Sequence, residues 1–267
     1  MITIGMDLGS QTVKIVIMKD GKVIARAKEL SGFEQEVTAS DVMKDVLTQA
    51  DLKPEAIDRI VATGAGRKTA PFTKESVTGV GAAARGAIAR FPTARTVLDV
   101  GAEEGRAIVI TPEGKVKDFA INEKCAAGSG TFIEAMARAL EITVVEFGKL
   151  ALTSDKAVPM NAQCAVFAES EVVSLLHART PKNDITRAVC DAIASRIISM
   201  ARRVSIEPEV VLIGGMAYNV GFLASLKRTL EETEIHILDD PEYVGAEGAA
   251  WIAHDKIVGK TTVHIQD

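Results

Sequence analysis

An internal repeat restricts the fold of this chain more than any other feature of its sequence. Residues 7–17 read DLGSQTVKIVI and residues 99–109 read DVGAEEGRAIV, an offset of 92 positions (99 − 7 = 92). Each copy opens with Asp-apolar-Gly and runs on to a turn and a further short strand, DGKV at 20–23 and EGKV at 113–116. An acidic residue followed by Gly between apolar runs is typical of a β-hairpin. The repeat therefore predicts two hairpins of one design in two related lobes.

Outside the repeats, helical and extended patterns alternate along the chain. The spacing predicts helices over 39–50, 78–91, 129–140, 165–178, 184–204, 219–230 and 245–255, and strands over 57–63, 96–100, 209–215 and 236–241. Such alternation indicates an α/β fold. We expect a first lobe formed by residues 1–78 with about 245–267, and a second lobe formed by 79–244.

Composition excludes several classes of function. Apolar residues make up 47% of the 267 residues, charged residues 25% and aromatic residues 4%, and the formal net charge is −5. Few aromatics and no basic run argue against nucleic-acid binding. The N-terminus MITIGMDLGS lacks the basic and apolar regions of a signal peptide, and no window is apolar enough for a membrane helix. We therefore expect a cytoplasmic protein with neither nucleic-acid nor membrane partners.

The first hairpin carries a candidate phosphate site. A turn that opens at Gly9 lets backbone N–H groups approach a ligand, because glycine has no side chain in the way. Ser10 and Gln11 add hydrogen-bond donors, and Lys14 adds a positive charge or simply faces solvent. Asp7, at the end of its strand, is suited to hold Mg²⁺ through water. Taken alone, the motif also fits a purely structural hairpin.

The second hairpin supplies Asp99 and Gly101 for the same purpose. A third element, IGGMAYN at 213–219, follows a strand and precedes a helix, so that Gly214, Gly215 and Asn219 could lie beside a nucleotide. An ordinary turn is the alternative. This order of elements resembles the actin/sugar-kinase/Hsp70 ATPases. The resemblance implies a duplicated, ribonuclease H-like, two-lobed fold with Mg·ATP between the lobes and the Gly-Gly turn by the adenosine.

Two of the three cysteines share a setting. Cys125 in NEKCAAGSGTF and Cys164 in NAQCAVFAESEV each follow an Asn-x-x triplet and precede a predicted helix, where a thiolate is stabilised. Two thiolates do not complete a four-cysteine cluster site, but a twofold axis would bring two more from another subunit. From the chemistry of the residues alone, a cluster, a structural zinc and buried free thiols all remain open.

Both cysteine segments resemble those of the BadF/BadG/BcrA/BcrD-type ATPase family, which includes 2-hydroxyacyl-CoA dehydratase activators and benzoyl-CoA reductase ATPase subunits. The similarity extends over nearly the whole chain, including DLGSQTVK, TGAGR at 63–67, ARGA at 84–87, GGMAYN and GAEGAA. It implies that Cys125 and Cys164 help to ligate one [4Fe–4S] cluster shared between two subunits. Cys190 matches no family cysteine, and we expect it to be packed in a helix.

The second hairpin departs from the activator pattern. Activators typically read Asp-apolar-Gly-Gly-Gln-Asp there, whereas this chain has Ala102 and Glu103 in place of the second Gly and the Gln. The Gln is thought to orient the attacking water, so the expected catalytic residues are Asp7, Asp99 and Glu103. Ala83 stands where activators tend to have a histidine. The form GAEEGRAI is closer to a benzoyl-CoA reductase ATPase subunit.

On this resemblance, we expect the ATP-hydrolysing, cluster-containing subunit of an ATP-dependent benzoyl-CoA reductase. Its partners would be a second ATPase-type subunit, homologous or identical, the catalytic acyl-CoA-reducing subunits, and a low-potential donor such as ferredoxin. An activator of a 2-hydroxyacyl-CoA dehydratase is the first alternative. A small-molecule kinase of the same fold and a nucleotide sensor without turnover are the others, and a colourless protein would favour a kinase.

Overall fold

The computed structural model describes residues 1–122, 129–160, 164–231 and 233–260. Its contacts divide the chain into two compact units. The first unit comprises Met1–Val97, Ile110–Asp118 and Asp239–Asp267, and the second comprises Leu98–Val109 and Phe119–Leu238.

The first unit contains a mixed four-stranded sheet in the order β3-β2-β1-β4. Its strands are β1 (Ile2–Leu8), β2 (Thr12–Lys19), β3 (Lys22–Leu30) and β4 (Arg59–Thr63). β1 and β2 pair antiparallel, as do β2 and β3, whereas β1 and β4 run parallel. The first predicted hairpin is therefore confirmed.

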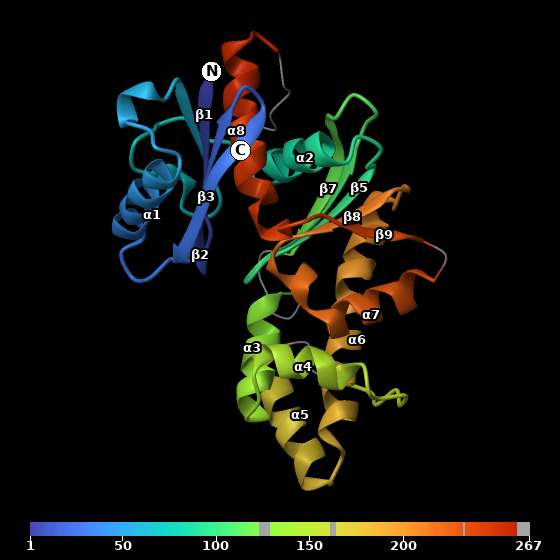
Figure 1. Ribbon diagram of the computed structural model, residues 1–267. Coiled ribbons are helices and arrows are strands. Elements are labelled where there is room, and N and C mark those ends of the chain that lie inside the picture. The colour runs from blue at the N-terminus through green and yellow to red at the C-terminus, as the bar shows by residue number, and fades with distance from the viewer. Residues whose placement is uncertain (123–128, 161–163, 232, 261–267) are drawn as a thin grey trace. The chain divides into compact units, whose positions relative to one another are not determined.

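Helices cover both faces of this sheet (Figure 1). α1 (Gln35–Gln49) packs on one face, over an apolar cluster that includes Ile4, Met6 and Leu8. α8 (Val244–Ile257) packs on the other face, against Val16 and Val61. Alternate residues of β1 thus face opposite layers, as the period of two in a strand requires. Short 3₁₀ turns complete the unit at Pro54–Ala56, Arg67–Thr69 and Pro241–Tyr243.

α2 (Gly79–Arg90) belongs to the first unit by its contacts, although the sequence-based division placed residues 79–244 together. The physical reason is its packing on α8. A Cβ atom at Gly248 would lie 1.8 Å from the carbonyl oxygen of Ala82, so the two helix backbones meet almost directly. Ion pairs join the same helices, including Arg85 with Asp255 at 2.7 Å.

The five-stranded sheet repeats the plan of the first, in the order β7-β6-β5-β8-β9. Its strands are β5 (Thr96–Val100), β6 (Gly105–Ile110), β7 (Val116–Asn122), β8 (Val210–Ile213) and β9 (Ile235–Ile237). In each sheet the strand that ends with the repeated Asp-apolar motif lies between its hairpin partner and a later strand. The internal repeat of the sequence is thus a repeat of sheet topology.

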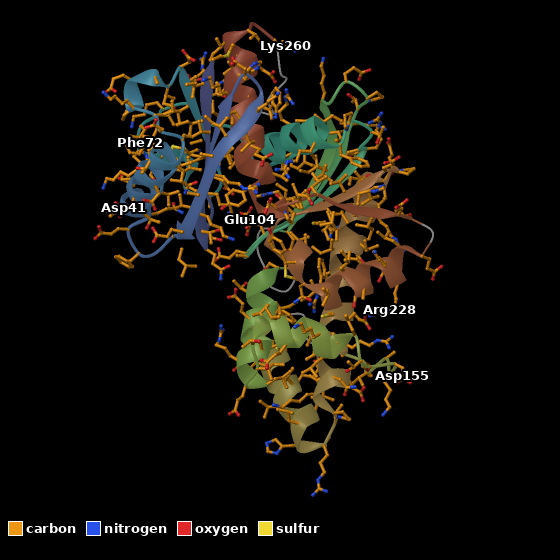
Figure 2. All side chains as sticks on the ribbon, viewed as in Figure 1. Asp41, Phe72, Glu104, Asp155, Arg228 and Lys260 are labelled. Carbon is orange, nitrogen blue, oxygen red and sulfur yellow. The ribbon has the colours of Figure 1, made fainter. Side chains whose placement is uncertain are left out.

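The remaining helices of the second unit enclose a separate core. They are α3 (Gly130–Ala139), α4 (Val144–Ala151), α5 (Ala165–His177), α6 (Lys182–Ala201) and α7 (Val220–Leu230), with 3₁₀ turns at Arg202–Val204 and Gly215–Tyr218. Phe132, Phe147 and Phe222 are fully buried in this core. At its surface, Arg228 of α7, which is labelled in Figure 2, pairs with Asp191 of α6 at 2.6 Å. Within the described ranges, no helix is both long and apolar enough to span a membrane.

Candidate nucleotide site

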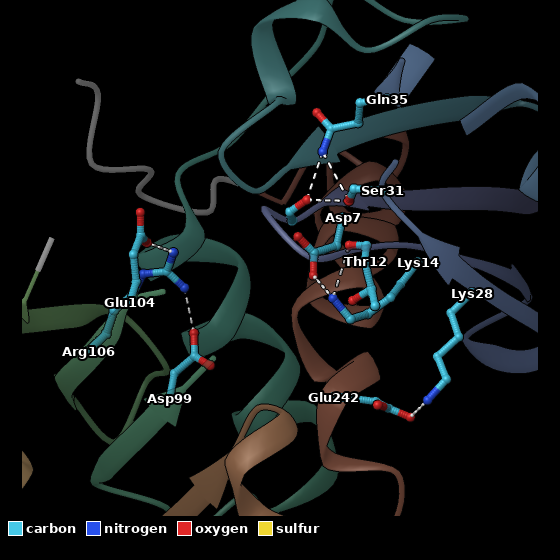
Figure 3. Close-up of polar contacts among 11 residues, drawn as sticks. Asp7, Thr12, Lys14, Lys28, Ser31, Gln35, Asp99, Glu104, Arg106 and Glu242 are labelled. Atoms are coloured by element: carbon cyan, nitrogen blue, oxygen red, sulfur yellow. Dashed lines mark hydrogen bonds and ion pairs between the residues drawn. The ribbon is translucent and has the colours of Figure 1, made fainter. Parts of the chain in front are cut away.

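The carboxylate of Asp7 is held by a lysine from the neighbouring strand. Asp7 and Lys14 are register partners in the β1–β2 hairpin, and Lys14 Nζ lies 3.1 Å from Asp7 Oδ2 (Figure 3). The two side chains are only 17% and 12% exposed, so little water screens the pair. The structure therefore brings Asp7 and Lys14 together, and the view of Lys14 as a solvent-facing residue is wrong.

Gly9 turns the chain from β1 into β2. Its N–H donates to the carbonyl oxygen of Thr12 at 3.1 Å. Its own carbonyl oxygen accepts from Ser31 Oγ and from Gln35 Nε2, both at 2.7 Å. Ser31, which follows β3, and Gln35, the first residue of α1, thus fix the turn, a role that the sequence analysis did not identify.

Two further residues of this turn were predicted to bind nucleotide. Ser10 is exposed and Gln11 is half-buried. The carbonyl oxygen of Gln11 accepts from Ser31 N at 2.9 Å, which adds to the attachment of the turn. Both residues lie beside Asp7 in the chain, but their role as nucleotide ligands stays a prediction.

The second hairpin reproduces the arrangement of the first. Arg106 donates to Asp99 Oδ2 at 2.6 Å and also pairs with Glu104 (Figure 3). The N–H of Gly101 donates to the carbonyl oxygen of Glu104 at 2.9 Å, which matches the bond from Gly9 to Thr12. In each hairpin the basic residue lies seven positions after its aspartate (14 − 7 = 106 − 99 = 7). Glu103, at the tip of the turn, is exposed.

A glycine that follows the neighbouring strand of the sheet lies against each aspartate. Gly64 follows β4 with φ +87°, and a Cβ atom there would lie 2.5 Å from Asp7 Oδ1. Gly214 follows β8 with φ +86°, and a Cβ atom there would lie 3.0 Å from Asp99 Oδ1 and 2.4 Å from the carbonyl oxygen of Val100. A left-handed backbone and this close approach both require glycine. The TGAGR and GGMA turns are therefore counterparts.

The Gly-Gly turn leads into α7. Gly215 has no atom within 4 Å of the place where a Cβ would stand, so it borders open space. Asn219 caps α7, because its Oδ1 accepts from Phe222 N at 2.9 Å. Asn219 is 7% exposed, and its Nδ2 has no hydrogen-bond partner in the part of the chain that is described. The helix cap is thus an observed role, and contact with nucleotide stays a prediction.

The second hairpin is anchored by the start of α3. The N–H groups of Gly130 and Thr131 donate to the carbonyl oxygens of Gly101 and Ala102, each at 2.9 Å. These donors are the first two residues of α3, and intrahelical bonds cannot use such N–H groups. The hairpin that carries Asp99 is thereby tied to the helix that follows the segment of Cys125.

The cysteines differ in accessibility. Cys164 is exposed at the residue that precedes α5, as its sequence setting predicted, so its thiol is available to a metal or cluster. Cys190 is buried within α6, where burial raises the pKa of its thiol, and its predicted packing in a helix is confirmed. Cys125 lies outside the described residues.

These groups fit a Mg²⁺-bound nucleotide. Each aspartate gives one carboxylate oxygen to a basic side chain and directs the other toward a glycine turn with no side chain. Carboxylates and water are the ligands that Mg²⁺ prefers, and exposed turn N–H groups suit phosphate oxygens. An exposed thiol at a helix start likewise suits iron.

The comparisons agree with this chemistry. A model of the BadF/BadG/BcrA/BcrD ATPase family matches residues 4–253. The chain is 36% identical to an activator of lactoyl-CoA dehydratase from Anaerotignum propionicum, over 96% of this chain and 98% of that protein. It is also 36% identical to the (R)-2-hydroxyglutaryl-CoA dehydratase activating ATPase of Acidaminococcus fermentans, over 95% and 97%. A benzoyl-CoA reductase subunit of Thauera aromatica is 33% identical over 96% and 95%.

Solved structures extend the agreement to the fold. The activator of the 2-hydroxyisocaproyl-CoA dehydratase from Clostridium difficile, with bound ADPNP, superposes with a TM-score of 0.90 at 33% identity over the whole of both chains. A glucokinase of the ROK family from Streptomyces griseus superposes with a TM-score of 0.58 at 13% identity over 96% of this chain and all of that one, which shows the shared sugar-kinase fold alone. The expected actin/sugar-kinase/Hsp70-like α/β fold is confirmed, and the chain belongs to the BadF/BadG/BcrA/BcrD ATPase family.

Proposed function

We propose that this protein is the ATP-hydrolysing activator of a 2-hydroxyacyl-CoA dehydratase and that it delivers a low-potential electron to that enzyme. The observation that carries the proposal is the pair of matched hairpins, in which Asp7 and Asp99 meet a glycine turn in the same way. Each of these turns suits phosphate oxygens and hydrated Mg²⁺. The similarity to activators over nearly their full length supports a dehydratase as the enzyme that accepts the electron.

The benzoyl-CoA reductase assignment rested on GAEEGRAI at 101–108, and it receives less support than its alternative. Activators of three dehydratases match at 33%, 36% and 36% identity, against one reductase protein at 33%. An activator also superposes over the whole chain. The replacements at Ala102 and Glu103 in one turn are a narrow basis for choosing between partners, because surface turns vary readily among relatives.

We assign each residue of the nucleotide site a role on this proposal. Asp7 and Asp99 would hold hydrated Mg²⁺, and the turns that begin at Gly9 and Gly101 would present N–H groups to the phosphates. Glu103 would orient the water that attacks the terminal phosphorus by accepting a hydrogen bond from it; the bond to the bridging oxygen breaks, and the proton of the water passes to the released phosphate. Ser10, Gln11 and Lys14 add donors to the phosphates. Gly214, Gly215 and Asn219 border the adenosine.

The two cysteine segments would hold the cluster. Cys125 and Cys164 supply two thiolates, and a second copy of the chain or a related subunit supplies two more. When bound, a [4Fe–4S] cluster accepts and releases one electron at a time. The two hydrogen bonds from Gly130 and Thr131 support a coupling route, because movement of the second hairpin pulls on the start of α3.

The experiment combines the anaerobically purified chain with its dehydratase, a low-potential reductant and ATP. An activator consumes ATP during start-up and then supports many dehydration turnovers without it, because the electron is recycled. ATP consumption in step with every turnover would overturn the activator assignment and favour a reductase. Asp7→Asn should abolish start-up, whereas Asp41→Asn, at an exposed residue of α1 that pairs with Lys44 of the same helix, should leave it unchanged.

A further inference from the structure

The side-chain amide of Gln35, the first residue of α1, contacts two turns of the first unit. Its Nε2 donates to the carbonyl oxygen of Gly9 at 2.7 Å, and Ser31 Oγ lies 3.4 Å from the same nitrogen (Figure 3). Its Oε1 lies against the TGAGR turn, because a Cβ atom at Gly66 would stand only 1.9 Å from that oxygen. One amide group therefore lies between the turn that follows β1 and the turn that follows β4.

Gly66 leaves the room that this amide occupies. Its φ and ψ are −84° and 9°, values that most residues adopt in a type I turn, so its backbone does not require glycine. The atoms closest to a Cβ there would be Oε1 and Cδ of Gln35, at 1.9 and 2.8 Å, followed by Leu8 Cβ at 3.1 Å. Gly64, by contrast, has φ +87° and needs glycine for its own conformation. The small residue at position 66 is thus explained by the amide of Gln35.

Both turns border Asp7. The Gly9 turn begins two residues after it, and a Cβ atom at Gly64 would lie 2.5 Å from Asp7 Oδ1. In the second unit, the carbonyl oxygens of the corresponding turn accept from the backbone N–H groups of Gly130 and Thr131. Those donors do not depend on the identity of a side chain. The first turn depends on side-chain donors for its position, so a single substitution can release it.

We propose that Gln35 is a positioning residue of the nucleotide site: by joining the Gly9 turn to the TGAGR turn, its amide fixes the direction in which the Gly9 turn presents N–H groups to the phosphates. Ser31 Oγ donates to the same carbonyl oxygen of Gly9 at 2.7 Å, so the turn keeps one side-chain bond when Gln35 is changed. The inference rests on the proposed function, because the direction of these N–H groups matters only where the turn binds phosphate.

The test measures binding of ADPNP and of adenosine to the full-length, anaerobically purified chain in excess Mg²⁺. Gln35→Ala should weaken ADPNP binding by about fivefold, the size of one neutral hydrogen bond. Gly66→Ala should have the same effect, because the new methyl group displaces the amide of Gln35 from Gly9. Adenosine, which has no phosphates, should bind every variant as it binds the wild type. Gln49→Ala, at an exposed glutamine at the other end of α1, is the matched control and should change neither affinity.

A double-mutant cycle separates this role from a structural one. In the double variant Gln35→Ala/Gly66→Ala, the space left by the amide accepts the new methyl group, so ADPNP affinity should stay within about twofold of that of Gln35→Ala. The melting midpoints of both single variants should stay within about 4 °C of the wild type, because Ser31 still holds the turn. Unchanged ADPNP affinity in Gln35→Ala, an equal loss of adenosine affinity, or effects that add in the double variant would overturn the inference but leave the proposed function intact. A wild-type chain that does not bind ADPNP would overturn both.

Discussion

Alanine substitutions at four glycines should separate those that the fold needs from those that a nucleotide needs. At Gly64 and Gly214, φ is near +87° and a Cβ atom would stand within 2.5 Å of backbone or carboxylate oxygen. The left-handed conformation costs about 1–2 kcal/mol for alanine, and overpacking adds about 1–3 kcal/mol. We expect each substitution to reduce the free energy of unfolding by about 2–5 kcal/mol, or roughly 5–15 °C in Tm.

Gly101 and Gly215 should behave in the opposite way. A Cβ atom at Gly101 would lie 3.6 Å from the nearest atom, and one at Gly215 would meet nothing within 4 Å. Neither residue has a positive φ, so alanine should change stability by less than about 0.5 kcal/mol. A new methyl group facing the ligand should instead weaken nucleotide binding by about 1–3 kcal/mol, which is about 5- to 150-fold in Kd.

Circular dichroism melting and ADPNP titration of the four variants together give the assay. The reasoning predicts low stability for Gly64→Ala and Gly214→Ala, and normal stability with weak binding for Gly101→Ala and Gly215→Ala. Wild-type affinity in both of the latter variants would refute the placement of nucleotide against these turns. Wild-type stability in Gly64→Ala would refute the matched-turn geometry itself.

Three other predictions concern the turn tip and the cysteines. Glu103→Ala should lower the ATPase kcat by about 10²-fold, whereas Glu103→Gln should retain turnover; equal rates in Glu103→Ala and the wild type would exclude the role of Glu103. Iron analysis of anaerobic protein should give about four irons per subunit pair, lost in Cys164→Ser and retained in Cys190→Ser. In cluster-free protein at pH 8, iodoacetamide should modify exposed Cys164 but not Cys190, because burial raises the pKa of the Cys190 thiol and keeps it protonated at that pH; peptide mapping that finds Cys190 modified without unfolding would contradict this.

Much of the architecture could be predicted because it repeats. The offset of 92 residues between the two Asp-apolar-Gly segments predicted both hairpins, and strand and helix periodicities placed most of the other elements. α4 was missed, although Thr143 and Glu146 form a capping box at its start, with Thr143 Oγ1 accepting from Glu146 N at 3.2 Å. The T-x-x-E spacing could therefore have predicted the start of this helix from the sequence.

The side-chain contacts of the site could not be predicted in the same way. Ser31 and Gln35 lie 22 and 26 residues from Gly9, and nothing in their local pattern points to its carbonyl oxygen. The matching of Gly64 with Gly214 was also missed, because TGAGR and IGGMA share too few letters to align. It depends on which strand lies next to β1 or β5, and sheet order is a long-range property that local periodicity does not contain.

Both copies of the hairpin have an aspartate, a basic side chain paired with it and a glycine, but their turns are attached to different neighbours. In the first unit, side chains of Ser31 and Gln35 hold the carbonyl oxygen of Gly9, so the turn is anchored to the residue after β3 and to the start of α1. In the second unit, backbone N–H groups at the start of α3 hold the corresponding carbonyl oxygens. A nucleotide that shifts both turns would therefore act on different elements. Movement of the first turn would act on α1 through Gln35, and movement of the second turn would act on α3, the helix that follows Cys125. On the proposed function, each turn binds phosphate oxygens, and the different anchors let the two turns act on different helices.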